Sequence, residues 1–158
     1  MNENINKAER TAMAAATKQQ ALLQRPVTQW WRLTPAIAFD AIALREMRAA
    51  LSKIDMLGEP RWKDAATGDA AASIHIALGL SPEESAEARF DLAMTALAIC
   101  AADGNAAAFL VMSHILRKIP GAGKAEARIA TSWLTHAFCE VLSRRAGKTT
   151  GAEHKGVA

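Results

Sequence analysis

Residues 68–100 read GDAAASIHIALGLSPEESAEARFDLAMTALAIC, and residues 104–139 read GNAAAFLVMSHILRKIPGAGKAEARIATSWLTHAFC. Both segments open with Gly-Asp/Asn-Ala-Ala-Ala, contain Ala-Glu-Ala-Arg near the middle and end on a cysteine. The two copies are offset by 36 residues at the start and by 39 residues after the middle. A repeat of this length is typical of stacked helical hairpins. We therefore expect two hairpin units, at 68–103 and 104–142.

The composition favours helices over sheets. Of the 158 residues, 51% are hydrophobic, with alanine supplying much of that fraction, whereas aromatic residues make up 5% and tyrosine is absent. Alanine has the highest helix propensity, and Val, Ile and Tyr are the usual residues of strands. The chain is long enough to bury one core. We predict an all-α fold of five to six helices, in which N-terminal helices cap two degenerate hairpin repeats.

Proline, glycine and capping residues set the expected helix boundaries. Arg25-Pro26 ends a first helix, because the residue before a proline is pushed out of helical geometry. Thr34-Pro35 begins a second helix, which Gly58 stops. Ser81 and Glu84 form a capping box at the start of the fourth helix. The predicted helices span 4–24, 34–57, 68–79, 81–102, 105–118 and 124–145.

The segments between these helices complete the predicted domain organisation. Residues 59–67 are expected to be irregular, and Gly104 is expected to close the fourth helix in the left-handed conformation. The organisation predicted from the sequence is an N-terminal helix and junction at 1–33, a helical bundle at 34–145, and a disordered tail at 146–158.

The second unit carries a recognisable residue pattern. Gly104-Asn105 precedes Ala106 and Ala108, a glycine-bearing loop follows at 121–123, and Ala130-x-x-Trp133-Leu134-x-x-Ala137 closes the unit. This pattern resembles the SEL-like helical repeats, relatives of the tetratricopeptide repeats. The resemblance implies that small residues let the two helices of a hairpin touch, and that Trp133 and Leu134 fill the gap to a neighbouring hairpin. In the first unit, Met94 stands in place of the tryptophan.

Two groups of residues are candidates for contacting a partner protein. The junction before the second helix contains Trp30, Trp31 and Arg32, and tryptophan and arginine are enriched at binding hot spots. The first unit contains an acidic stripe at four-residue steps, made of Glu83, Glu87 and Asp91. This stripe could attract a basic peptide or a cation. The sequence therefore favours a non-catalytic adaptor or regulator that binds another protein through a groove between hairpins.

The charge distribution leaves two alternatives open. The net charge is −5 for residues 68–104 and +4 for residues 105–145, so the chain is dipolar rather than uniformly basic. A small nucleic-acid-associated regulator could use the basic second unit and the tail, with the candidate residues Arg117, Lys118, Lys124, Arg128, Arg144, Arg145 and Lys148. The other alternative is an accessory subunit of an enzyme, whose site forms only on assembly.

Cysteine usage and motif spacing argue against catalysis and cofactors. Cys100 and Cys139 lie at matching places in the repeats, so both are expected to be free, reduced and on inward faces. Histidine and cysteine spacing shows no metal-ligand pattern beside the acidic stripe. We expect no metal, no cofactor and no enzyme activity from the isolated chain.

The apolar stretch 92–116 is interrupted at its centre by Asp103-Gly104, which favours a turn between buried helices over a membrane span. A cytoplasmic protein without a secretory signal is the expectation.

Overall fold

The computed structural model describes residues 25–150, with side chains described for 25–143. Within this range every regular element is a helix and no strand occurs, which confirms the all-α prediction. Six α-helices occur among the described residues: α2 (Ala41–Leu51), α3 (Trp62–Ala66), α4 (Ala70–Gly79), α5 (Ala88–Ala102), α6 (Ala106–Lys118) and α7 (Lys124–Thr150). They are joined by three 3-10 helices, η1 (Val27–Arg32), η2 (Ala36–Ala38) and η3 (Pro82–Ala86). The predicted helix 4–24 lies outside the described residues.

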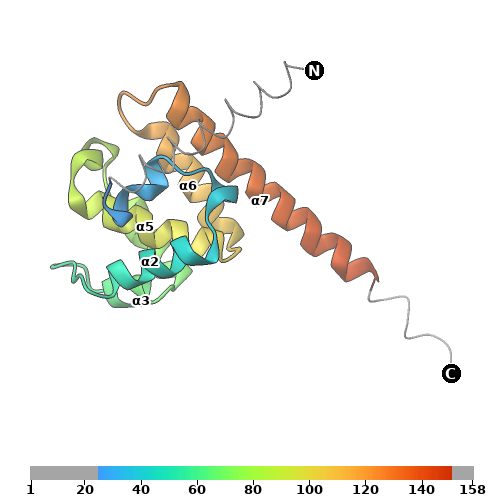
Figure 1. The fold of residues 1–158 in the computed structure, drawn as a ribbon, viewed down its shortest axis with the longest axis horizontal. Coiled ribbons are helices and arrows are strands. Elements are labelled where there is room, and N and C mark those ends of the chain that lie inside the picture. Colours follow the sequence, from blue (N-terminus) through green and yellow to red (C-terminus); the bar gives the residue numbers. More distant parts are fainter. Residues whose placement is uncertain (1–24, 151–158) are drawn as a thin grey trace, which may run out of the picture.

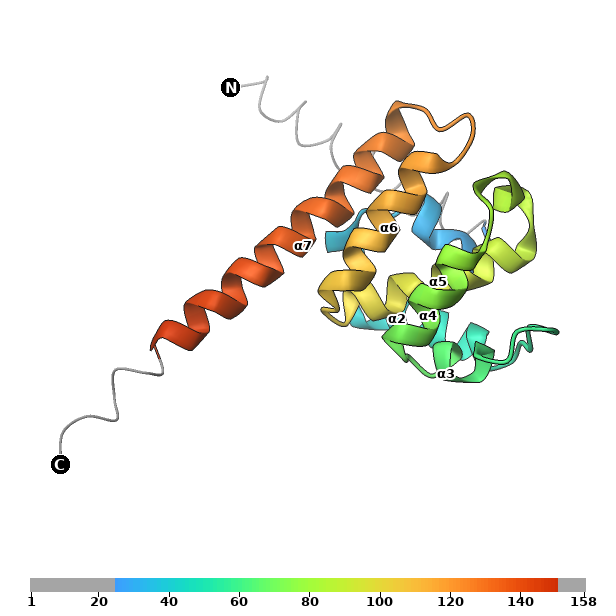
Figure 2. The same cartoon turned by 180° about the vertical axis from the view of Figure 1, so that it is seen from behind.

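The helices pack as two successive hairpins. α4 pairs with α5 and α6 pairs with α7, while α5 also packs against α6, η1 and α2. Figures 1 and 2 show α5 at the centre of the bundle and α7 as a long helix that runs out beyond the other elements. The core contains large, fully buried side chains from both hairpins and from the N-terminal segment, including Trp31, Trp62, Phe90, Phe109 and Trp133.

Each hairpin begins with the same local structure. Gly68 and Gly104 both adopt positive φ, at 102° and 91°, which glycine reaches without a Cβ penalty. The next residue is then an N-cap in each unit. An Asp69 carboxylate oxygen accepts a hydrogen bond from the Ala72 N–H at 2.7 Å, and the Asn105 amide oxygen accepts one from the Ala108 N–H at 3.0 Å. The predicted hairpin starts, and the left-handed Gly104, are confirmed.

The repeat keeps a single register of 36 residues in space. α5 begins at Ala88 and α7 at Lys124, which is the same offset as between α4 and α6. Cys100 contacts Ser73, its Sγ lying 3.4 Å from the Ser73 Oγ, whereas in the second unit the Phe109 ring stacks on His136 with centroids 4.9 Å apart. His136, rather than Cys139, therefore occupies the place of Cys100.

The prediction that both cysteines face inward is consequently wrong for Cys139. Cys100 is buried and Cys139 is exposed. The matching cysteines are 39 residues apart in sequence, so a helix that keeps the 36-residue register moves Cys139 by three positions. Three positions correspond to about 300° of rotation and roughly 4.5 Å along the axis, which is enough to take the thiol out of the core.

The N-terminal half departs from the prediction of one helix over 34–57. The chain forms η2, then an extended residue at Phe39, and then α2, which ends at Leu51. Asp40, not Thr34, is the N-cap of α2, because its carboxylate accepts the Ala43 N–H at 2.8 Å. The extended conformation at Phe39 brings its ring to within 5.5 Å of the Trp133 ring, measured between centroids. The break between η2 and α2 thus places Phe39 against Trp133, a residue far along the chain.

Three other predicted boundaries need correction. The helix expected over 81–102 is divided at Glu87, whose ψ of 146° separates η3 from α5, although the Ser81–Glu84 capping box is present. The segment expected to be irregular at 59–67 contains α3, which is fixed by a hydrogen bond from the Trp62 indole N–H to the Ile54 carbonyl at 2.8 Å. The tail expected to be disordered from residue 146 is helical as far as Thr150, and residues 151–158 lie outside the described part.

Candidate interaction surface

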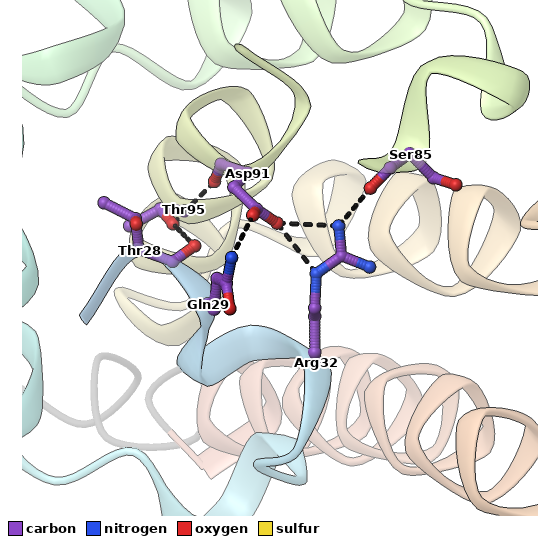
Figure 3. A network of polar contacts seen from close by, with 6 residues as sticks. All are labelled: Thr28, Gln29, Arg32, Ser85, Asp91 and Thr95. Carbon is purple, nitrogen blue, oxygen red and sulfur yellow. Dashed lines mark hydrogen bonds and ion pairs between the residues drawn. The ribbon is translucent and has the colours of Figure 1, made fainter. Parts of the chain in front are cut away.

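The residues of the predicted N-terminal junction are brought together with the first hairpin by a polar network (Figure 3). The Arg32 guanidinium forms an ion pair with the Asp91 carboxylate at 2.7 Å and donates through Nε to the same oxygen at 2.8 Å. Gln29 donates to the other Asp91 oxygen at 2.8 Å. Arg32 also donates to the Ser85 carbonyl oxygen. The side chains of Arg32 and Asp91 are only 23% and 4% exposed, so the network fastens η1 to α5 inside the protein.

Thr95 extends this network by one more link. Its hydroxyl group lies 2.8 Å from the carbonyl oxygen of Thr28 and 2.7 Å from that of Asp91, and it can donate to either (Figure 3). The N-terminal segment is thereby tied to α5 at two levels, one turn of the helix apart.

The two tryptophans of the junction lie in the bundle rather than on an open surface. Trp31 is fully buried, its ring lying 6.1 Å from the Phe90 ring and beneath the Arg32 guanidinium at 4.4 Å from the ring centroid. Trp30 is partly buried and packs against the core. The junction that the sequence singled out as a partner surface is thus built into the fold, and Trp31 has no exposed surface with which to contact a partner.

The expected acidic stripe on one helix face does not exist. Glu83 lies in η3, Glu87 is the residue at which the chain breaks, and Asp91 is buried in the network with Arg32. Glu83 is exposed, and a hydrogen bond from Ser81 lowers the pKa of its carboxyl. The stripe is absent because the four-residue spacing places side chains on one face only where the helix is continuous.

Most of the basic residues of the second unit are grouped around the turn between α6 and α7. Arg117, Lys118, Lys124 and Arg128 are all exposed there. Arg144 and Arg145 belong to the distant half of α7, and their side chains lie outside the described part. The predicted basic set is therefore divided between the two ends of α7.

Two surface hollows of about 300 Å³ occur among the described residues. One is lined by Arg32, Glu126 and Arg128, where η1 meets the start of α7. The other lies at the start of the two hairpins beside Cys100, a buried residue whose thiol pKa is raised by burial. A thiol that keeps its proton at neutral pH is a poor nucleophile. Within residues 25–150 no three His, Cys, Asp or Glu side chains converge as metal ligands, and no helix is both long and apolar enough to cross a membrane.

The second half of α7 carries an uncovered apolar face. Among the side chains of α7 that the structure describes, Ala137 is the last buried one, about halfway along a 27-residue helix whose hairpin partner α6 has 13 residues. Beyond that point Phe138 is 60% exposed, Val141 37% and Leu142 62%. Steps of three and four residues place these side chains on one side of the helix, together with the half-buried Leu134. We call Leu134, Phe138, Val141 and Leu142 the α7 stripe.

Sequence reasoning missed the α7 stripe although its spacing was visible. The same stretch contains Trp133 and Ala137, which form the buried face, so the segment has apolar residues on two sides. Other large apolar side chains are exposed in other parts of the described chain, at Ile37, Ile42, Ile54, Leu57, Leu78 and Leu110. The α7 stripe differs from these because it lies on a helix that projects from the bundle in both views (Figures 1 and 2).

Comparison with protein-family models, with curated proteins and with solved structures finds no match to this chain.

Proposed function

We propose that this protein is a non-catalytic interaction module, an adaptor or regulator, that binds protein through the α7 stripe. The observation that supports the proposal is the exposure of Phe138, Val141 and Leu142 on the projecting half of α7. Exposed apolar patches on a folded domain mark interaction sites, because their burial against a partner is favourable by about 25 cal/mol per Å². The face has the spacing of an amphipathic helix that docks by its apolar side.

The length of the projecting half supports the same interpretation. Residues 138–150 form 13 residues of helix in which none of the described side chains, 138–143, is fully buried. Isolated helices of about 12–15 residues are marginal in water, and most helical stability in proteins comes from packing of an apolar face. A partner that covers the α7 stripe would supply that packing.

We further propose that the two hairpins are divergent SEL-like repeats. The repeated Gly-Asx start, with a left-handed glycine and an N-cap in each unit, favours a common origin for the hairpins. Trp133 differs from the role that the resemblance implies, because its ring contacts Phe39 and Phe109 rather than a third hairpin. We assign the protein to a reducing compartment such as the cytoplasm, since Cys100 and Cys139 are both free.

The test is capture of cellular proteins on the immobilised full chain. We compare the unmodified protein with the Phe138→Glu and Leu142→Glu single variants and with Ser143→Glu, which adds the same single charge at an exposed position of the same helix half but off the stripe. The proposal predicts that proteins bound by the unmodified chain and by Ser143→Glu are lost from both stripe variants. Identical capture by all four proteins, with circular dichroism showing equal helicity, would place the binding surface elsewhere.

A second candidate function is association with nucleic acid through the turn between α6 and α7. The supporting observation is the exposure of Arg117, Lys118, Lys124 and Arg128, with Glu126 as the neighbouring acid. Phosphate contacts release counterions, so binding to random duplex should weaken steeply between 50 and 200 mM salt, by roughly tenfold or more for a few contacts. Absence of binding at low salt would remove this candidate.

A further inference from the structure

We propose that a second copy of this chain covers the α7 stripe, with the projecting halves of two α7 helices packed antiparallel. This inference rests on the proposed function in one respect, namely that the α7 stripe is a protein-binding surface. It adds the identity of the occupant and the register in which the two helices meet.

The stripe is self-matching when the helices run in opposite directions. If the twofold axis passes level with residue 140, Phe138 of each copy lies against Leu142 of the other, and Val141 flanks both contacts. Phe138 and Leu142 are four residues apart and therefore share a face, whereas Glu140 between them points to the other side of the helix. One axis thus pairs the two most exposed side chains of the stripe twice, as in the isologous interfaces of twofold dimers.

The bundle leaves room for the second helix. Ala127 and Thr131 continue the line of the stripe toward the start of α7, and both are exposed. An antiparallel helix centred at residue 140 would extend its last residue, 150, to the level of residue 130 of its partner. It would therefore lie along a face of α7 that no described element covers.

Charge favours the antiparallel direction over the parallel one. The sequence after the stripe contains Arg144, Arg145 and Lys148. In a parallel pair these residues of the two copies would lie side by side and repel. In the antiparallel pair Arg145 is level with Thr135 of the other copy, and the two basic ends are roughly 15 Å apart along the axis, beyond the Debye length of about 8 Å at physiological salt.

The size of the stripe sets the expected strength. A stable interface buries about 800 Å² on each partner, and three exposed apolar side chains with their neighbours provide less than that. We therefore expect a reversible dimer in the micromolar range rather than an obligate one.

The exposed cysteine provides a direct readout. Cys139 is exposed one residue from the expected axis and Cys100 is buried. Successive helix residues are turned by about 100°, so the two Cys139 thiols flank the interface on one side of the helix pair rather than facing each other. Treatment of the reduced, purified full chain with a bismaleimide that spans roughly 15 Å, more than the distance of about 8–10 Å between packed helix axes, should give a covalent dimer, which Cys139→Ser abolishes. Sedimentation of the untreated chain should show mass rising with concentration. A monomeric mass throughout, with no covalent dimer, would overturn the inference.

A charge exchange tests the register. Phe138→Glu and Leu142→Lys should each weaken dimerisation at least about tenfold, because each homodimer would bury two unpaired charges. An equimolar mixture of the two variants should dimerise to within a few-fold of the unmodified chain, since the introduced glutamate and the introduced lysine meet across the axis only in the antiparallel register. Ser143→Glu should dimerise normally. Failure of the mixture to recover, while the unmodified chain dimerises, would overturn the antiparallel arrangement.

The outcomes separate this inference from the proposed function. A chain that stays monomeric but captures other proteins through the stripe overturns only the second copy as occupant. A chain that neither dimerises nor shows stripe-dependent capture overturns both.

Discussion

The two hairpins start alike and end differently. Gly68-Asp69 and Gly104-Asn105 give the same left-handed turn and the same N-cap. α5 is then buried along nearly its whole length from Phe90 to Ala101, because neighbouring elements cover it on several sides. α7 is buried on one face as far as Ala137, and beyond it Phe138, Val141 and Leu142 are exposed. A repeated sequence thus fixes the local structure of a hairpin, whereas its place in the stack decides which of its faces are covered.

The second helix of the first hairpin, α5, has 15 residues, and that of the second hairpin, α7, has 27. A turn that follows α5 and is missing from α7 explains this difference in length. Asp103 caps the C-terminus of α5, and Gly104 reverses the chain so that α6 packs against it. At the corresponding point after Phe138 no glycine or proline occurs before Gly147, and the helix continues. The apolar residues Val141 and Leu142 are therefore exposed to solvent on this continuation of α7.

The first hairpin should depend strongly on its buried ion pair. Asp91→Ala leaves the mostly buried Arg32 charge without its partner, so we expect a loss of about 3–5 kcal/mol in the free energy of unfolding. Asp103→Ala breaks the exposed Arg48–Asp103 pair, whose side chains are 45% and 46% exposed, and should cost about 1 kcal/mol or less. Urea denaturation measures both values. Equal small losses would mean that the network does not hold η1 on α5.

The two thiols should differ in reactivity as the two hairpins differ in coverage. Cys139 is exposed and should react with a maleimide at the rate of a free thiol, whereas Cys100 reacts only when the core opens. We expect the rates in the native protein to differ by at least about a hundredfold. Labelling followed by peptide mass spectrometry assigns each rate. Comparable rates would show that the first hairpin opens far more readily than its burial indicates.

The two glycines that begin the hairpins should lose equal stability when a side chain replaces their hydrogen. Gly68→Ala and Gly104→Ala each force a residue with Cβ into the left-handed region, at a cost of roughly 1–2 kcal/mol. Gly79 at the end of α4 is the control, because its φ is not positive and nothing lies within 4 Å of an added Cβ. Gly79→Ala should leave the melting temperature unchanged or raise it. A clear difference between the Gly68 and Gly104 variants would show that the two starts are not energetically equivalent.

The N-cap residues of the two hairpins should each contribute less to the free energy of unfolding than the glycine turns do. Asp69→Ala and Asn105→Ala remove the acceptors of the Ala72 and Ala108 N–H groups, and each should lower the free energy of unfolding by about 1 kcal/mol. Asp40→Ala, at the cap of α2 outside the repeat, should cost a similar amount. Unfolding curves of the three variants make the comparison. A negligible effect at Asn105 alone would indicate that α6 is held by packing rather than by its cap.

The smallest expected effect is the pH dependence that Cys100 gives to the first hairpin. Burial raises the pKa of its thiol above the ordinary value of about 9, so the folded chain retains a proton that the unfolded chain releases. The stabilising contribution of the protonated thiol is therefore complete below that ordinary value and is lost as the pH rises above it and through the raised pKa of the folded chain. Cys100→Ala should lose less stability between pH 8 and 10 than the unmodified chain. If the free energy of unfolding falls equally with pH in both proteins, burial does not raise the pKa of the Cys100 thiol.

Local signals predicted much of this fold and little of its surface. Left-handed Gly104 and the Ser81–Glu84 box follow from steric and hydrogen-bonding rules within a few residues, and both are present. The break at Phe39 and the pairing of Arg32 with Asp91 could not be predicted in this way. They depend on Trp133 and on a carboxylate 59 residues away, which only folding brings near.

The sequence by itself determined that this chain folds into helices arranged as a repeated hairpin, because alanine content, caps and glycine turns act over one or two helical turns. The tertiary structure decided which apolar residues are covered. Trp31 and Asp91 lie inside because η1 folds back onto α5, Cys139 lies outside because α7 keeps the 36-residue register, and Phe138 and Leu142 are exposed because α7 extends past α6. Coverage depends on the relative positions of elements far apart in the chain, and helical periodicity shows which residues share a face without showing whether a neighbour lies against it.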